Sequence, residues 1–242
     1  YACGWASDVA DAAVARLAAD LRRREPEFAL DLHSVTQACR LAQASAIPRG
    51  RPLVLADTQD NPGAGGNADT TSLLKALVQA RVRRVLAGVY CDPLAAARAH
   101  EAGLGAQVDL DLGGRSGPPG ETPFAARFEV VALGDGRFTG TGPFYRGGRF
   151  ELGPMALLRI DDVYVAVSSR KQQAADQAMF RHLGVEPADF AVLALKSSVH
   201  FRADFGPIAS RIVVVAAPGP NVADPSQLPF TRLRAGMRFA GR

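Results

Sequence analysis

The chain has 242 residues, of which 48% are hydrophobic, so it can bury a substantial core and is not disordered in its main state. Lys and Arg number 28 against 24 acidic residues, and the net charge of +4 is too small and too dispersed to indicate a nucleic-acid-binding protein. Three cysteines lack metal-binding spacing, and no apolar run reaches the roughly 18 to 20 residues that span a membrane, so we expect a cytoplasmic protein.

Two helices are predicted near the N-terminus. Apolar side chains recur at helical spacing over residues 7–24, and three arginines close this segment, where positive charge suits the helix dipole. Pro26 ends the first helix, and residues 31–44 are predicted to form a second helix capped by Ser34. Because the chain begins at Tyr1 and not at a methionine, we expect it to be a piece of a longer polypeptide.

The next segment combines a strand, a Gly-rich loop and the start of a helix. The apolar run 52–56 predicts a buried strand, and a helix is predicted over 70–81. The loop between them carries Asp60, Asn61 and Gly63. A helix N-terminus beside such a loop favours anions, because its unpaired N–H groups and its dipole point toward the loop. No lysine follows the glycines as in a nucleotide-binding P-loop, and a flexible connection without a ligand is the alternative interpretation.

Strands and helices continue to alternate after this loop. A strand over 85–90 and a helix that begins near Asp92-Pro93 complete a βαβ pattern, which predicts parallel strand pairing. Residues 106–169 then alternate apolar and polar residues and contain turn sequences at 134–136 and 161–162. This pattern predicts an antiparallel β-meander with a hairpin at each of the two turns.

The strand–turn–helix order returns near the C-terminus. Helical periodicity over 172–184 is followed by a predicted buried strand at 190–195, a helix at 199–209 and a second buried strand at 212–216. The turn after the first of these strands gathers the polar residues Lys196, Ser197, Ser198, His200 and Arg202. Such groups could bind a carboxylate or orient a carbonyl. In the alternative, structural interpretation, the two serines cap the helix and His200 lies on its surface.

These elements define an α/β protein with a largely parallel sheet, flanking helices and an antiparallel β-meander section. Parallel strands end at the same edge of a sheet, so the polar residues after 52–56 and after 190–195 are expected to form one concave patch. Tyr145, in a Gly-rich connection of the meander, could also reach a ligand, although an exposed loop is the simpler interpretation.

Five segments carry further information: ADTQDNPGAGGNADTT (56–71), GDGRFTGTGPFYRG (134–147), ELGPMALLRI (151–160), SSRKQQAADQAMFRHLGVEPADF (168–190) and LKSSVHFRADF (195–205). In this order, within residues 51–234, they resemble the C-terminal region of the microcystinase C (MlrC-like) family. Members of that family are zinc-dependent hydrolases, most of them bacterial, and are named for degrading linearised microcystin peptides. The resemblance therefore implies a metallopeptidase or amidohydrolase that cleaves a peptide or amide bond.

The resemblance also implies a division of labour between two domains. Residues 1–47 look like a helical remnant of the family's N-terminal metallopeptidase domain, and residues 48–242 look like its C-terminal α/β domain. Zinc is held in that family by acidic residues and histidines of the N-terminal domain. The four histidines of this chain share no ligand spacing, so we expect the zinc to be bound outside it and the fragment alone to be inactive.

The family-matching polar clusters are then assigned to the substrate. His200 and Arg202 are predicted to be catalytic, as donors to the oxyanion that forms opposite the metal. The predicted substrate-binding residues are Asp60, Asn61, Gly63, Lys196, Ser197 and Ser198. The expected partners are a peptide or small amide substrate and the N-terminal domain, with a homo-oligomer possible and no membrane contact. A small-anion or carboxylate-binding module without catalysis is the alternative, and a zinc-dependent amidase for a small metabolite lies between the two.

Overall fold

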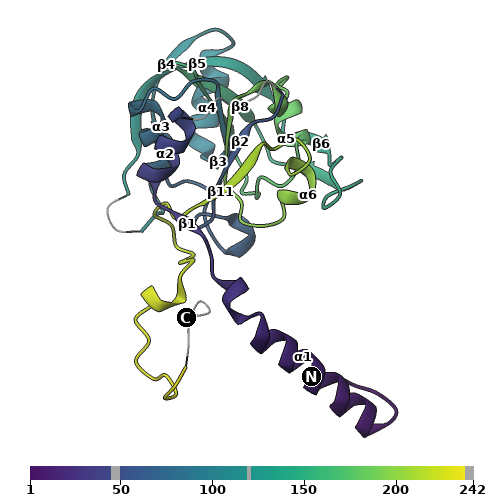
Figure 1. Cartoon of the computed structure of the whole chain (residues 1–242). Coiled ribbons are helices and arrows are strands. Elements are labelled where there is room, and N and C mark those ends of the chain that lie inside the picture. Colours follow the sequence, from purple (N-terminus) through teal and green to yellow (C-terminus); the bar gives the residue numbers. More distant parts are fainter. Residues whose placement is uncertain (45–49, 119–120, 238–242) are drawn as a thin grey trace. The chain divides into compact units, whose positions relative to one another are not determined.

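The computed structural model describes residues 1–44, 50–118 and 121–237 and contains two compact units. The larger unit is Leu32–Ala223, and the smaller one combines Tyr1–Asp31 with Asp224–Arg242 (Figure 1). The domain boundary predicted between residues 47 and 48 lies outside the described residues, so that division of the chain stays a prediction.

The larger unit is built on one sheet with the strand order β1-β11-β2-β10-β3-β9-β8-β5-β4. The bounds of its strands are β1 Leu32–His33, β2 Leu53–Asp57, β3 Val85–Cys91, β4 Gln107–Leu112, β5 Phe124–Gly134, β8 Met155–Ile160, β9 Val163–Ser168, β10 Val192–Leu195 and β11 Arg211–Val215. Neighbours from β1 to β9 pair in parallel, and the β9-β8-β5-β4 part is antiparallel. The predicted largely parallel sheet with an antiparallel section is thereby confirmed.

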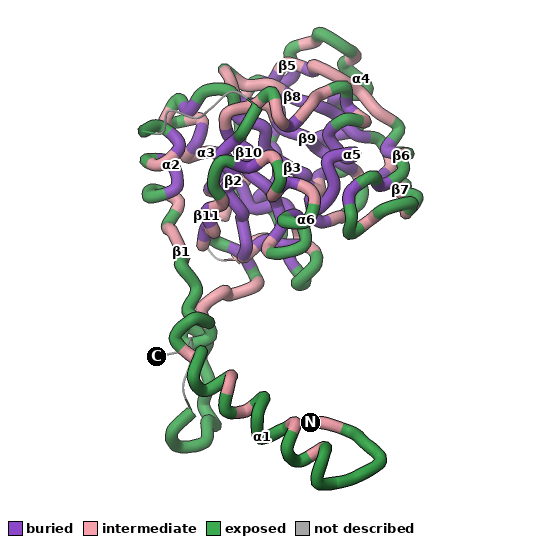
Figure 2. Tube along the Cα trace, turned by 45° about the vertical axis from the view of Figure 1, so that its right-hand side comes forward, coloured by how far each residue is buried: buried purple, intermediate pink, exposed green. Residues whose placement is uncertain are grey.

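Helices cover both faces of this sheet. They are α2 Val35–Ala44, α3 Ser72–Gln79, α4 Pro93–Ala102, α5 Ala178–Arg181 and α6 Arg202–Phe205. Helices α2, α3 and α4 contribute to one apolar layer, and α5 and α6 contribute to the other. Side chains of β2 alternate between the layers, with Leu55 in the first and Val54 in the second. All residues of β2 and β10 are buried as a result, and Figure 2 shows this burial concentrated in the sheet.

The predicted hairpin at Gly134–Gly136 is wrong, whereas the one at Asp161-Asp162 is confirmed by the antiparallel pairing of β8 with β9. Strand β5 ends at Gly134, and the next strand, β6 (Arg137–Thr139), pairs with β7 (Arg149–Glu151) in a separate two-stranded sheet. At the end of β5, residues 129–134 pair with β8, and β6 pairs with β7 instead of folding back on β5. The glycines therefore carry the chain from one sheet to the other.

Several helices are shorter than their periodicity predicts. Helix α3 begins at Ser72, and the backbone N–H of Thr70 before it donates to Asp60. Helix α5 covers only the end of 172–184, and the N–H of Ala174 before it donates to the carbonyl of Lys196 at the end of the sheet. Helix α2 begins after Ser34, which caps it as predicted by accepting from the N–H of Gln37.

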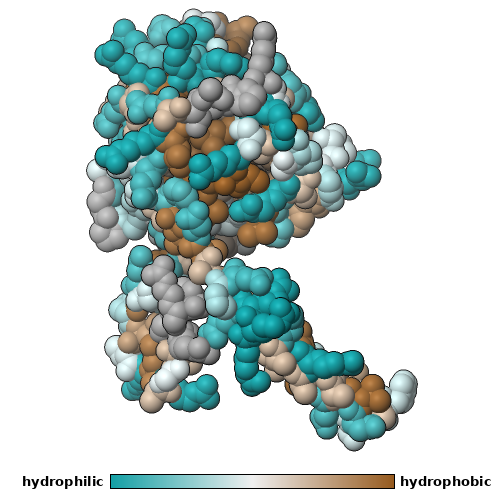
Figure 3. Space-filling view, viewed as in Figure 1, coloured by the Kyte–Doolittle hydropathy of each residue, from teal (hydrophilic) through white to brown (hydrophobic). Residues whose placement is uncertain are grey.

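The smaller unit contains α1 (Ser7–Arg23), which confirms the first predicted helix. Its apolar side chains are exposed, with Val9, Leu17 and Leu21 at 62%, 55% and 47%. The resulting hydrophobic surface along this helix is visible in Figure 3. In the part of the chain that the structure describes, no helix is long and apolar enough to cross a membrane.

Phe128 of β5 offers a test of the sheet packing, because it is fully buried and contacts the ring of Phe124 edge-on at 5.8 Å. We expect Phe128→Ala to lower the free energy of unfolding by about 3–5 kcal/mol, because it removes apolar contacts and leaves a cavity. Urea titration of the chain measures this loss. The control is Leu94→Ala on α4, where the side chain is 64% exposed and the change should stay within about 0.5 kcal/mol. Equal losses in both variants would contradict the packing described.

Candidate functional site

The candidate site lies where β2 and β10 end side by side. Leu195 of β10 is paired with Ala56 of β2, so Lys196 and Asp57 follow at the same level of the sheet. The Nζ atom of Lys196 lies 2.8 Å from Asp57 Oδ2 and 2.9 Å from Asp60 Oδ2. It also donates to the carbonyl oxygen of Thr70 at 2.6 Å and lies 4.8 Å from the centre of the Tyr90 ring. A single ammonium group thus joins strands β2, β3 and β10 to the loop before α3.

Asp60 holds that loop in place. Its Oδ1 accepts from the N–H groups of Asn67 and Ala68, both at 2.9 Å. Its Oδ2 accepts from Lys196 and from the N–H and the hydroxyl of Thr70. Asp60 is fully buried, and every one of these donors lies within 3.0 Å of it. The unpaired N–H groups that the sequence suggested for an external anion are therefore used by a carboxylate of the chain itself.

The two carboxylates beside Lys196 differ in protonation behaviour. Burial raises the pKa of Asp57, and the attraction of Lys196 offsets this only in part. Burial acts in the same direction on Asp60, but the charge and hydrogen bond of Lys196 and the bonds from Thr70 outweigh it and lower the pKa. The contrast agrees with the geometry, because Asp57 Oδ1 has no hydrogen-bond partner among the described residues. Burial disfavours the charge of Lys196, but the two carboxylates raise its pKa and keep it an ammonium.

A second connection joins the loop after β2 to the turn after β10. The Thr58 hydroxyl donates to Ser198 Oγ at 2.8 Å, and the Ser198 hydroxyl lies 3.0 Å from the carbonyl oxygen of Thr58. Asn61 accepts from the N–H of Gly63 at 3.0 Å and so shapes the turn that follows. The prediction that both polar clusters share one edge of the sheet is confirmed by these contacts and by the Lys196–Asp60 ion pair.

His200 is exposed at this edge and has defined neighbours. Its ring stacks on Phe144, with centroids 4.0 Å apart and planes inclined by 14°. Its Nδ1 atom lies 3.2 Å from Oε1 of Gln173, and Nε2 of that amide donates to the Tyr145 hydroxyl at 2.9 Å. Sequence analysis left Tyr145 open and missed Phe144 and Gln173. Their only signal was membership of the family-matching segments 134–147 and 168–190, since a helix was expected around Gln173 and an exposed loop around Phe144.

The predicted site residues fall into a buried and an accessible group. Asp60, Asn61, Lys196 and Ser197 are at most 4% exposed, so in this conformation they support the loops, and their contact with a substrate stays a prediction. Ser197 Oγ has no bonding partner among the described residues, and Ser197 does not cap α6, which begins at Arg202. Gly63, His200 and Arg202 are exposed, and Ser198 is partly so. Only this accessible group can contact a ligand from solution without a change of conformation.

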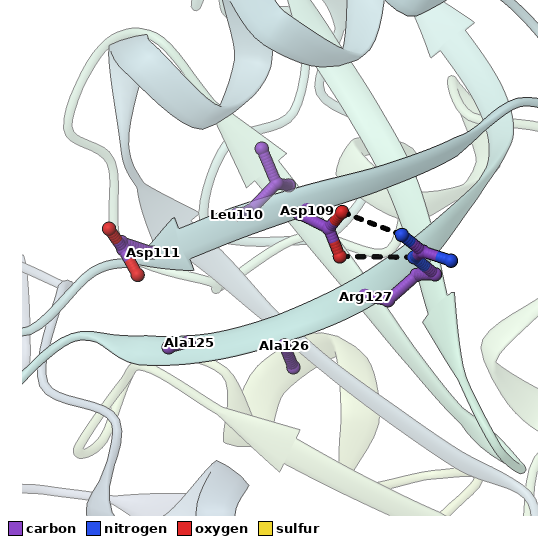
Figure 4. A pocket seen from close by; sticks show the side chains of 6 residues that line it. All are labelled: Asp109, Leu110, Asp111, Ala125, Ala126 and Arg127. Carbon is purple, nitrogen blue, oxygen red and sulfur yellow. Dashed lines mark hydrogen bonds and ion pairs between the residues drawn. The ribbon is translucent and has the colours of Figure 1, made fainter.

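A hollow of about 380 Å³ lies elsewhere, on β4 and β5. Figure 4 shows its lining residues, Asp109, Leu110, Asp111, Ala125, Ala126 and Arg127. Asp109 and Arg127 form an ion pair at 2.8 Å, but their side chains are 71% and 67% exposed, so solvent screens the interaction. None of the predicted site residues lines this hollow, and the sheet edge remains the better candidate. Within the described residues, no group of three or more His, Cys, Asp or Glu side chains could hold a metal ion.

The family model and the two relatives that match this chain are consistent with one another. A family model described as the MlrC C-terminus matches residues 55–232. Microcystinase C from Sphingomonas sp is 32% identical over 166 residues, which are 69% of this chain and 32% of that protein. A crystal structure described as "Putative metallopeptidase" from Mesorhizobium sp. BNC1 shares 29% identity and a TM-score of 0.73, and the match covers 85% of this chain and 40% of that one. The chain thus spans well under half the length of these two relatives.

Removal of the ammonium group of Lys196 tests whether the buried ion cluster stabilises the fold. We expect Lys196→Met to lower the free energy of unfolding by about 3–5 kcal/mol, because it leaves Asp57 and Asp60 buried without their counter-ion. Urea titration measures the loss. Lys171→Met is the control, since this exposed lysine at the same edge has one long contact, 3.5 Å to Asn67 Oδ1, and its loss should cost no more than about 0.5 kcal/mol. A tolerated Lys196→Met would show that the ion cluster does not stabilise the fold.

The carboxylate of Asp60 makes part of the stability dependent on pH. Its pKa is lower in the folded chain, so its stabilisation is present above the unfolded value of about 3.9 and is lost as pH falls through the folded value. We therefore expect the difference in unfolding free energy between the unmodified chain and Asp60→Asn to be constant between about pH 7 and 5 and to shrink below about pH 4. Denaturant titrations over this range measure it. A difference that stays constant down to about pH 2 would rule out this role for Asp60.

Proposed function

Because the chain belongs to the MlrC C-terminus family, we propose that it is the C-terminal domain of a zinc-dependent hydrolase that cleaves a peptide or amide bond. The names of both relatives support a peptidase-like hydrolase. The observation that carries the proposal for this chain is the joined sheet edge, where buried ions fix two loops and leave His200 and Arg202 accessible. Open α/β sheets place their ligands at this edge.

In this proposal the zinc belongs to the N-terminal domain. The described part of this chain does not fit a zinc site, because His33, His100, His182 and His200 lie in separate segments and form no cluster of three or more with acidic residues or cysteines. The contribution of this chain is therefore to bind and polarise the substrate. We place it in the cytoplasm of a bacterial cell, with the N-terminal domain as its direct partner.

Each accessible group then has a defined task. Arg202 is always cationic, so its guanidinium can donate to a substrate carboxylate or to the carbonyl oxygen that becomes negative during cleavage. The guanidinium carbon, Cζ, lies 5.4 Å from the centre of the Phe201 ring. Because Phe201 is fully buried, this contact keeps the guanidinium near the surface of the protein above that ring. Ser198 is partly exposed at the same edge, and its hydroxyl oxygen can accept a further hydrogen bond from a peptide N–H, while Asn61 is buried and shapes the turn at Gly63.

A binding module without catalysis is the second candidate. The exposed cation of Arg202 would suit a small carboxylate equally well. Metal content separates the two functions. After dialysis we expect the full-length protein to retain about one zinc per chain and the present chain to retain none. Zinc held by the present chain alone would overturn the placement of the metal, and a zinc-free full-length protein would favour the binding module.

Kinetics of the full-length protein test the role of Arg202. With a linear peptide substrate, we expect Arg202→Ala to lower kcat by about 10²-fold or more and to change KM less, because the donor acts mainly on the transition state. Arg211→Ala is the matched control: it removes the same charge from an exposed residue at the start of β11, the opposite end of the strands, and should leave kcat unchanged. An unchanged kcat/KM in Arg202→Ala would remove Arg202 from the mechanism.

A further inference from the structure

The hydrogen bonds around His200 define the state of its imidazole. The Gln173 amide lies with Nε2 2.9 Å from the Tyr145 hydroxyl and with its carbonyl oxygen, Oε1, 3.2 Å from His200 Nδ1. In this orientation of the amide the carbonyl oxygen can only accept, so Nδ1 carries the proton. In a neutral imidazole the other nitrogen, Nε2, then has a free lone pair. Neutral His200 thus presents an acceptor to a ligand, whereas the oxyanion role suggested from sequence requires a donor.

The packing around Gln173 keeps this arrangement in place. Gln173 is only 6% exposed, so its side chain is enclosed by the protein. A second amide, Nε2 of Gln172, donates to the same Tyr145 hydroxyl at 2.5 Å. Gly63 lies so close that a Cβ atom there would be 2.5 Å from Gln173 Oε1. The Gly-rich loop therefore touches the amide that orients His200, and Phe144 covers one face of the imidazole.

We propose that Gln173 and Tyr145 are positioning residues that hold His200 in its Nδ1–H form, so that Nε2 acts as the proton acceptor of the site toward an N–H or O–H group of the substrate. The substrate part of this inference rests on the proposed function. The two catalytic groups are then complementary: Arg202 donates to the carbonyl oxygen, and His200 accepts from a neighbouring peptide N–H or from another donor. Gly63 serves the same arrangement by leaving room for the Gln173 amide.

Imidazole nitrogen NMR tests the assignment on the present chain. Long-range ¹H–¹⁵N spectra distinguish the two neutral forms, and His→Gln variants assign the four rings. The spectra are recorded at about pH 8.5, two units above the ordinary imidazole pKa. His182 is an internal reference, because the N–H of Gly136 donates to its Nε2 at 3.0 Å and fixes the proton on Nδ1. We expect His200 to show the same pattern as His182. The reverse pattern, with the proton on Nε2, would overturn the proposal.

Three variants show whether Gln173 is responsible. Gln173→Leu removes the acceptor, and Gly63→Ala displaces the amide, so in both the Nδ1–H pattern of His200 should be lost while that of His182 is unchanged. Gln173→Glu keeps an acceptor and should preserve the pattern. Retention of the pattern in Gln173→Leu would contradict the positioning role.

A kinetic cycle in the full-length protein connects the tautomer to activity. If Gln173 acts through His200, Gln173→Leu should lower kcat/KM in the unmodified protein but have no further effect in His200→Ala. Additive losses would show that Gln173 acts independently and would overturn the positioning role. If the full-length protein cleaves no peptide while the NMR pattern holds, the proposed hydrolase function fails and the assignment of Nε2 as an acceptor stands.

Discussion

Burying the ammonium of Lys196 at the end of β10 carries a hydration cost of several kcal/mol, which only close partners can offset. Asp57 at the end of β2 and Asp60 in the following loop supply them, at 2.8 and 2.9 Å. Because Asp60 also collects the N–H groups of Asn67, Ala68 and Thr70, the same ion cluster that joins the strands fixes the course of the loop. The positions of the accessible residues follow from it.

The buried residues of this cluster support the site, and the exposed residues around it are those that can contact a ligand. The buried ions set the loop, the loop places Gly63 against Gln173, and Gln173 orients the ring of His200. Arg202 begins the short helix α6 two residues further along the chain. An anion-binding geometry was expected from the Gly-rich loop, and it exists, but its occupant is a side chain of the protein. We therefore propose that an external ligand contacts side chains of the 198–202 turn and not the N–H groups of the loop.

Apolar runs and their spacing predicted the parallel sheet well, because buried parallel strands show their burial directly in the sequence. The polar ends of β2 and β10 were predicted to meet because parallel strands end at the same edge of a sheet. Other features depend on pairing between distant segments, which local patterns do not encode. The predicted hairpin at 134–136 is wrong because the end of β5 pairs with β8, and β6 pairs with β7. The burial of Lys196 could not be predicted either, since a lysine after a strand ordinarily reaches solvent.

Hydrogen exchange of individual amides tests most directly whether the Lys196 cluster holds the loop between β2 and α3. We compare the chain with its Lys196→Met variant under conditions where both are folded. The account predicts that the amides bonded to Asp60, those of Asn67, Ala68 and Thr70, lose protection, while those of the β8–β9 pair keep theirs. Unchanged protection of the three loop amides, or an equal loss throughout the sheet, would contradict it.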